Sequence, residues 1–223
     1  MKSFKKIGYY AEKHDDEHLG EASDLFAKKL KNYVEKFPAT ISYPFYQLKK
    51  EPVTILTSAD GLFRIYSWDD ETGGTMRYFD NIFQYKIAGR AEIIAAINKP
   101  EGESGSMYQE LYTFKANGKT YYLATTLEIG STIIYVNGIQ VFSIEGGKLN
   151  PDTKIIRTKS GLHSTIDYEY NPTLTADEKI SSYIHFDHDT QSIYIPIVLE
   201  KGKLTNKYIL YKFTGQYFER VKN

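Results

Sequence analysis

The densest group of side chains that could do chemistry lies in the first half of the chain. It is the run from Trp68 to Arg77, WDDETGGTMR, and Asp80 and Asn81 follow it on the next predicted strand. A tryptophan face can stack on a sugar ring, and carboxylates can accept hydrogen bonds from sugar hydroxyls or bind a hard cation. We therefore predict a binding site that comprises Trp68, Asp69, Asp70, Thr72, Arg77, Asp80 and Asn81.

The same run also has a plainer interpretation, as the loop of a hairpin. Acidic and glycine residues turn the chain, and Arg77 can pair with a carboxylate. Glycoside hydrolysis would instead need two carboxylates about 5 to 10 Å apart across one bond. Because Asp69 and Asp70 point to opposite sides of a strand, a catalytic pair would combine one of them with Asp80. No catalytic residue is assigned.

A second group of possible metal ligands is His185, Asp187, His188 and Asp189. Imidazole and carboxylate groups bind zinc, which needs three or four protein ligands. Alternation along a strand places His185 and Asp187 on one face and His188 on the other, so only two ligands converge. We therefore predict no metal site here, and we interpret Asp189-Thr190 as a turn.

The rest of the composition excludes several classes of function. The chain has no cysteine, no Gly-x-Ser-x-Gly motif, and no glycine-rich nucleotide loop leading into a helix, so we predict no cofactor. Lys plus Arg and Asp plus Glu both number 28, and a neutral chain lacks the long-range attraction that gathers nucleic acid. No stretch approaches the roughly 20 apolar residues of a transmembrane helix.

One amphipathic helix is predicted near the N-terminus, from Asp16 to Phe37. Asp16 can cap its start, and Pro38 disfavours helical geometry in the residue before it. Residues 3–13 predict an earlier helical turn. The apolar residues of the main helix recur every three or four positions, and they are Leu19, Ala22, Phe26, Leu30, Tyr33, Val34 and Phe37.

After Pro38 the hydrophobic period changes to two, which indicates strands. Paired turn residues separate the short apolar runs, at Asp60-Gly61, Asn117-Gly118, Asn137-Gly138 and Thr214-Gly215. The segments align as a weak internal repeat of three four-stranded meanders. The first comprises Val53–Thr57, Leu62–Trp68, Met76–Lys86 and Glu92–Ile97. The second comprises Glu110–Lys115, Lys119–Leu127, Thr132–Val136 and Ile139–Ile144. The third comprises Ser182–Asp187, Ser192–Leu199, Lys207–Phe213 and Gln216–Val221.

The predicted fold is mainly β, with three tandem four-stranded antiparallel meanders and an N-terminal amphipathic helix. The meanders form either a propeller-blade-like array or two packed sheets. We expect a single domain over 1–223, with a helical segment at 1–37 and a β region at 38–223. Three smaller features are also predicted. They are an extra hairpin of Lys154–Thr158 and Thr165–Tyr170 over an open edge, an edge strand or bulge at Pro196, and one helical turn after the capping box Thr175–Glu178.

Two segments carry a resemblance to known proteins. Thr57 to Met76 contains TSADGLFRIYSWD followed by TGGTM, and it resembles uncharacterised exported proteins of Gram-negative bacteria that share TSxDGxFRIYSWDxxTGGTM. The resemblance continues to Lys86. The closing YKFTGQYF, Tyr211 to Phe218, is similar to a final-hairpin pattern of secreted β proteins. The resemblance implies export to the periplasm or cell surface, with a cytoplasmic location as the alternative, and it brings no known activity.

Three functions remain open from the sequence. The leading hypothesis is a non-catalytic exported domain that binds a glycan or a protein partner, because tyrosines are abundant and suit recognition surfaces. The first alternative is a carbohydrate-active hydrolase that uses Asp69 or Asp70 with Asp80. The second alternative is a structural or assembly module, which would bury a large interface between copies.

Overall fold

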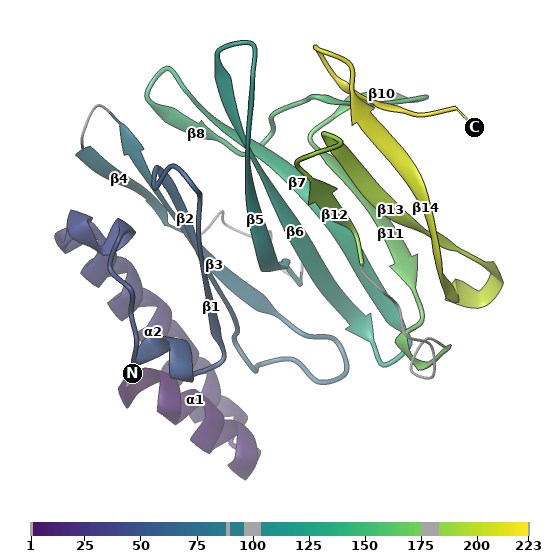
Figure 1. The fold of residues 1–223 in the computed structure, drawn as a ribbon. Coiled ribbons are helices and arrows are strands. Elements are labelled where there is room, and N and C mark those ends of the chain that lie inside the picture. Colours follow the sequence, from purple (N-terminus) through teal and green to yellow (C-terminus); the bar gives the residue numbers. More distant parts are fainter. Residues whose placement is uncertain (1, 88–89, 96–103, 175–182, 223) are drawn as a thin grey trace. The chain divides into compact units, whose positions relative to one another are not determined.

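The computed structural model is mainly β, with an N-terminal pair of helices and several antiparallel sheets (Figure 1). This confirms the predicted fold class at that level. The chain divides into two compact units, Met1–Tyr108 and Gln109–Asn223, which we call unit 1 and unit 2. The prediction of a single domain stays a prediction. The structure describes residues 2–87, 90–95, 104–174 and 183–222.

Unit 1 begins with two helices, α1 (Lys2–Lys13) and α2 (Asp16–Lys36). The side chain of Asp15 caps α2 by accepting a hydrogen bond from the backbone N–H of His18, so the cap lies one residue before the predicted one. The helix ends before Pro38, as predicted, and Phe37 N–H donates to the carbonyl of Tyr33. The predicted turn at 3–13 is a complete helix.

A four-stranded antiparallel sheet completes unit 1, with its strands in sequence order. This order is that of the first predicted meander, whose last two residues lie outside the described residues. The buried face of α2 packs on this sheet, where Tyr66, Trp68 and Ile82 join its core. The other elements of unit 1 are β1 (Val53–Thr57), β2 (Phe63–Asp69), β3 (Phe79–Ile87), β4 (Arg90–Ala95), and the 3₁₀ turns η1 (Pro38–Ile41) and η2 (Leu48–Lys50).

Unit 2 contains two sheets. One has the order β11-β7-β6-β5, with β8 on β7, and the other has the order β10-β9-β15-β14-β13-β12. The strands are β5 (Met107–Ala116), β6 (Lys119–Ser131), β7 (Ile134–Glu145), β8 (Lys148–Asn150), β9 (Ile156–Thr158), β10 (Gly161–His163), β11 (Thr165–Tyr170), β12 (His185–Asp187), β13 (Ser192–Val198), β14 (Leu204–Phe213) and β15 (Phe218–Arg220). Two 3₁₀ turns, η3 (Pro172–Leu174) and η4 (Glu200–Gly202), lie between strands.

The core of unit 2 draws on both sheets. Phe114, Leu123 and Val141 come from one sheet, and Ile156 and Phe218 come from the other. The two sheets of this unit therefore pack face to face around shared apolar side chains. The described residues form neither a closed barrel nor a propeller.

The predicted turn at Asn137-Gly138 is wrong, because β7 runs through it and the chain turns at 132–133 instead. Asn137 is buried, and its Nδ2 donates to the carbonyl of Thr126 at 3.0 Å. A Cβ on Gly138 would lie 2.9 Å from Thr126 Oγ1 and 3.0 Å from Asp167 Cβ. The glycine therefore allows neighbouring strands to approach closely, and it does not serve a turn.

The predicted hairpin of 154–158 with 165–170 is also wrong. Strand β9 pairs with the short β10, whereas β11 adds to β7 along six residue pairs. On its other side β9 pairs with β15 in parallel, with Ile156 beside Phe218. A hydrophobic pattern shows that a strand exists, but it does not specify which partner covers its edges.

The third predicted meander has the expected strand order, β12 to β15, inside the larger sheet. The pairing of β13 with β14 shifts register between Pro196 and Val198, which confirms the predicted bulge at this proline. The capping box at Thr175–Glu178 lies outside the described residues, as does Ser182 at the start of this meander.

Candidate functional site

The predicted cluster around Trp68–Arg77 forms a tight loop after β2. The loop is closed by a backbone bond from Asp70 N–H to the carbonyl of Tyr78 at 2.9 Å. Arg77 donates from Nε to Asp69 Oδ2 and from Nη2 to Glu71 Oε2, each at 2.6 Å. Burial lowers the pKa of Arg77, but the bonds and charges of Asp69 and Glu71 more than offset this and raise it above its ordinary value. These contacts are those of an ion-paired loop.

Asp70 and Thr72 form a second local arrangement in the same loop. Asp70 Oδ1 accepts hydrogen bonds from the backbone N–H of Thr72 at 2.9 Å and from its hydroxyl at 2.7 Å. A short carboxylate that binds the backbone two residues later is turn chemistry. Gly73 is required for the same turn, because a Cβ there would lie 2.1 Å from the carbonyl oxygen of Met76.

Trp68 is separated from these polar groups by the pleat of β2. Only 1% of its surface is exposed, and its ring meets Phe26 of α2 edge to face, with centroids 5.1 Å apart. A sugar cannot stack on a ring that the helix covers. The position of Trp68 therefore supports a packing role in the core of unit 1.

Asp80 and Asn81 lie on β3, next to this loop. Asp80 is paired across the sheet with Trp68, whereas Asp69 is paired with Phe79. Because directly paired residues share a face and neighbours alternate, Asp69 and Asp80 point to opposite faces. Asn81 Nδ2 donates to the carbonyl of Ser106 at 3.0 Å, which ties the following segment to the sheet. This geometry lends no support to Asp69 and Asp80 as a catalytic pair.

The histidine group also serves local structure. Asp187 Oδ1 accepts hydrogen bonds from the backbone N–H and hydroxyl of Thr190, both at 2.7 Å, in the turn after β12. The ring of His185 stacks on Tyr194, with centroids 5.0 Å apart. Within the described ranges, no three His, Cys, Asp or Glu side chains converge as they would to hold a metal ion.

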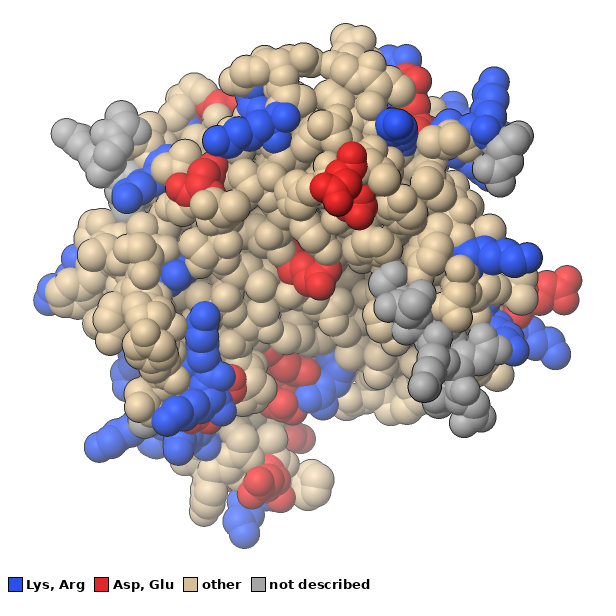
Figure 2. All heavy atoms as spheres, in the orientation of Figure 1, with Lys and Arg blue, Asp and Glu red and all other residues tan. Residues whose placement is uncertain are grey.

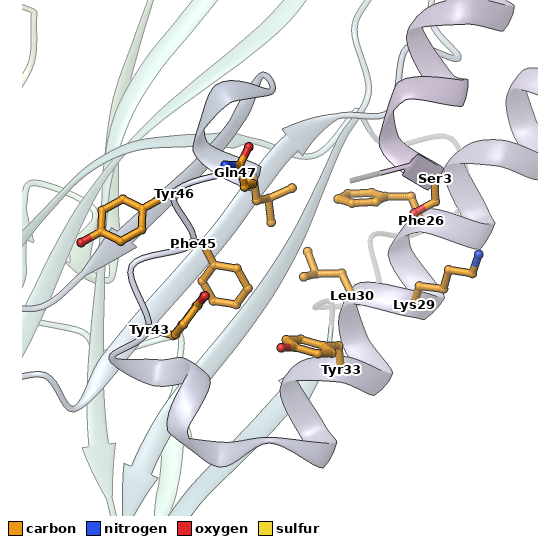
Figure 3. A pocket seen from close by; sticks show the side chains of 10 residues that line it. Ser3, Phe26, Lys29, Leu30, Tyr33, Tyr43, Phe45, Tyr46 and Gln47 are labelled. Atoms are coloured by element: carbon orange, nitrogen blue, oxygen red, sulfur yellow. The ribbon is translucent and has the colours of Figure 1, made fainter.

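A cleft that the sequence did not predict lies in unit 1, between α2 and the segment Tyr43–Leu48. It has a volume of about 560 Å³. Figure 3 shows Leu30 and Tyr33 of the helix pointing toward Phe45 of the segment, while the ring of Tyr46 points away from the helix. We call this feature the aromatic cleft. Its lining residues are Ser3, Phe26, Lys29, Leu30, Tyr33, Tyr43, Phe45, Tyr46, Gln47 and Leu48.

The aromatic cleft has a buried floor and an exposed aromatic mouth. Phe45 forms part of the floor, with 8% of its surface exposed, and its ring meets Tyr43 edge to face at 5.1 Å. At the mouth, Tyr33 is 48% exposed and Tyr43 is 54% exposed. Lys29 and Gln47 add hydrogen-bonding groups. The cleft thus offers aromatic faces together with a few polar groups.

A buried arginine fixes the segment that forms one wall of the cleft. Arg64 of β2 is 5% exposed, and its Nη1 donates to the carbonyls of Thr40 and Tyr43, both at 2.6 Å. Its Nε donates to Thr57 Oγ1 at 2.8 Å. The guanidinium lies 5.9 Å from the centre of the Phe45 ring. One cation therefore satisfies two backbone carbonyls and supports the floor aromatic.

Polar side chains of the sheet extend this support. The hydroxyl of Tyr66 donates to Gln84 Oε1 at 3.0 Å, and Gln84 Nε2 donates to Thr40 Oγ1 at 3.0 Å. Burial raises the pKa of Tyr66, and bonds and charge from Arg64 offset this only in part. The hydroxyl is therefore a neutral donor at physiological pH. The network holds residues 38–43 to the sheet.

The sequence contains one signal for the aromatic cleft. The segment ISYPFYQL, from Ile41 to Leu48, is rich in aromatic residues and has no clear period of two or of 3.6. Aromatic residues outside a regular element are candidates for a recognition surface. What the sequence could not show is that this segment lies against α2, since the contact joins residues that are not near neighbours in the chain.

Charged side chains of both signs are exposed on the surface. Acidic and basic side chains are interspersed with uncharged ones on the face shown in Figure 2. Among the described residues, neither helix combines the length and the apolar character that crossing a membrane requires. In comparisons with known proteins, no family model matches the chain, and no curated protein or solved structure matches it significantly.

Proposed function

We propose that this chain is a non-catalytic binding domain and that the aromatic cleft of unit 1 binds a glycan. The observation that carries the proposal is a cleft of about 560 Å³ with aromatic walls and a few hydrogen-bonding groups. Ligand sites are commonly clefts of about 300 to 1,000 Å³ with this kind of lining. The exposed rings of Tyr33 and Tyr43 offer faces for the apolar side of a sugar ring.

The cleft is suited to binding because its wall is held in place without a ligand. Arg64 donates hydrogen bonds to the carbonyls of Thr40 and Tyr43, and its guanidinium lies 5.9 Å from the centre of the Phe45 ring. A wall already ordered in the free protein loses little conformational entropy when a ligand enters. The lining groups supply stacking faces and hydrogen bonds, which fits recognition better than proton transfer.

A glycan array probed with the full chain tests this proposal. Replacing Tyr33 or Tyr43 with Ala should weaken binding of an array hit by about tenfold, since stacked aromatics are typical binding hot spots. Tyr9→Ala is the matched control, because Tyr9 is 56% exposed on α1 and does not line the cleft. An array without hits, or equal losses in the control, would contradict a glycan in the cleft.

A protein partner is the second candidate for the same surface. Large apolar side chains are exposed along α2 and the segment after it, including Phe37 at 45% and Tyr46 at 72%. Exposed aromatics of this kind are enriched where proteins bind each other. Leu25 is exposed on the same helix, at 39%, and does not line the cleft. A purified partner whose binding is lost in Leu25→Ala, with glycan binding unchanged, would favour this candidate.

We also propose that the chain acts outside the cytoplasm, at the periplasm or cell surface. The support is the resemblance of Thr57–Met76 to exported proteins of Gram-negative bacteria. Fractionation of a tagged protein expressed from its natural gene tests this. Recovery in the cytoplasmic fraction alone would favour the cytoplasmic alternative.

A further inference from the structure

Unit 2 contains a groove that is separate from the aromatic cleft and has a different chemistry. Its volume is about 1220 Å³. Ile197 of β13 and three stretches of chain line it: Arg157–Ser160 at the turn between β9 and β10, Tyr208–Tyr211 on β14, and Glu219–Lys222 at the C-terminal end. Figure 1 shows the C-terminal end close to β10. We call this feature the basic groove.

The parallel pairing of β9 with β15 creates the groove. Arg157 lies beside Glu219 in that register, so the C-terminal ends of the two strands lie at the same end of the sheet. Lys159, which follows β9, therefore lies near Arg220 at the end of β15 and Lys222 beyond it. In an antiparallel pair the C-terminal ends of the strands would lie at opposite ends of the sheet, and these cations would be far apart. The concentration of charge therefore results from the parallel topology.

The charge of the groove differs from that of the chain. It is lined by four basic residues and one acidic residue, although the whole chain has a formal net charge of zero. The acidic residue, Glu219, is already bound to Arg157, with Oε1 and Nη1 3.1 Å apart. Lys159, Arg220 and Lys222 form no ion pair with any described carboxylate. A concave surface lined by one sign of charge focuses its field and attracts ligands of the opposite sign.

Two contacts orient the side chain of Arg157 in the groove. Its guanidinium lies 4.1 Å from the centre of the Tyr217 ring, and its Nη1 is ion-paired with Glu219. In the adjoining turn, Thr158 Oγ1 lies 2.9 Å from Ser160 Oγ, which also lies 2.9 Å from His163 Nε2. The groove therefore combines an ion-paired guanidinium, exposed ammonium groups and hydroxyls, which together suit spaced anionic groups on a polar chain.

Aromatic side chains continue from the groove across the outer face of its sheet. Tyr208 lines the groove, and its ring lies 5.9 Å from that of Tyr194, which stacks on His185. Alternation places these three side chains opposite the core residues Ile193, Ile195 and Phe186. A linear ligand that enters the basic groove thus meets rings on which its sugar units can stack.

We infer that the basic groove binds an acidic polysaccharide, a chain whose sugar rings bear carboxylate or sulfate groups. The cations bind the anionic groups, and the hydroxyls and aromatic rings contact the sugars. Single-stranded nucleic acid shares some of this chemistry. It is disfavoured because a neutral chain with four clustered cations lacks the extended basic surface that follows a phosphate backbone.

The test measures binding of the full chain to polygalacturonate, heparin, neutral dextran and single-stranded DNA. Polygalacturonate or heparin should bind, with affinity that falls as salt is raised from about 0.05 M to about 0.5 M. Lys159→Glu combined with Arg220→Glu should weaken this binding by at least about tenfold, because two attractions become repulsions. The matched control is Lys115→Glu with Lys148→Glu, which makes the same charge change on exposed strand residues of unit 2 outside the groove.

Several results would overturn the inference. They are no binding to either acidic polysaccharide, equal losses in the groove and control variants, or tighter binding of DNA than of both polysaccharides. Circular dichroism on every variant shows whether it is folded, and Lys222→Glu alone gives a milder change at the chain end. The Tyr33→Ala variant should leave binding of the acidic polysaccharide unchanged. The proposal for the basic groove and the proposal for the aromatic cleft can therefore be rejected independently of each other.

Discussion

Unit 1 and unit 2 contain meanders with similar sequence patterns, but the meanders are covered in different ways. In unit 1, two helices cover a sheet whose strands pair only with their neighbours in sequence. In unit 2, a second sheet covers the first, and β9 and β11 pair with strands distant in sequence. The two units therefore carry different concave surfaces. In unit 1 an aromatic cleft lies beside helix α2, whereas in unit 2 basic residues lie together where β9 and β15 end.

The largest effect on stability is expected in the core between the helices and the sheet of unit 1. Trp68→Ala should lower the free energy of unfolding by about 3 to 5 kcal/mol, because it leaves a large cavity beside Phe26. Urea unfolding measures the loss, and hydrogen exchange should show it mainly in α2 and β2. Trp68→Phe, which keeps an aromatic ring, should lose less. Unchanged stability with abolished ligand binding would show that Trp68 serves a ligand.

The next largest effect is expected at the buried arginine of unit 1. Arg64→Met should cost about 2 to 4 kcal/mol, because it leaves the carbonyls of Thr40 and Tyr43 buried without their donor. It should also weaken binding in the aromatic cleft. Lys50→Met, which removes an exposed cation, is the control for both measurements. A variant with normal stability and normal binding would show that the wall of the cleft does not depend on Arg64.

Unit 2 should be most sensitive where its strands approach closely. Gly138→Ala should cost about 1 to 3 kcal/mol, since the new methyl group overlaps Thr126 and Asp167. Gly130→Ala is the matched control, because its Cβ would meet nothing nearer than 3.4 Å. Thermal unfolding compares the two variants. If Gly138→Ala is as stable as the control, residues 137–138 do not lie inside a continuous strand.

The smallest effect is expected at the start of α2. The hydrogen bond and charge of Asp15 raise the pKa of His18 above its ordinary 6.5, and His18 lowers the pKa of Asp15 below its ordinary 3.8. The contribution of His18 is complete below pH 6.5 and is lost as pH rises through its raised pKa. The contribution of Asp15 is complete above pH 3.8 and is lost as pH falls through its lowered pKa.

Nuclear magnetic resonance titration of the histidines measures this effect. The pKa of His18 should lie above 6.5 in the natural chain and return toward that value in Asp15→Asn. Between about pH 4 and pH 6, where both groups are charged in the natural chain, the melting temperature of Asp15→Asn should be slightly lower than that of the natural chain. Asp16→Asn, which removes the neighbouring carboxylate but keeps the bond between Asp15 and His18, is the control variant. An unshifted His18 would contradict the capping contact.

The functional residues divide between those that the sequence indicated and those that it did not. Asp69, Asp70, Thr72 and Arg77 were predicted as a binding site, and they do lie together, but their mutual bonds are those of a loop. Trp68 could not be assigned correctly, because strand alternation gives two faces and does not say which one a helix covers. Tyr33 was recognised only as part of a helix stripe.

Taken by itself, the sequence determined the features that depend on near neighbours. The extent of α2, the turns at Asp60-Gly61 and Asn117-Gly118, and the bulge at Pro196 follow from caps, positive φ angles and a missing N–H. Only the tertiary structure decided the partners of β9 and β11, the burial of Trp68, and the two concave surfaces. Alternating hydrophobicity is the same whichever strand lies alongside, so pairing is chosen by the packing of the whole unit.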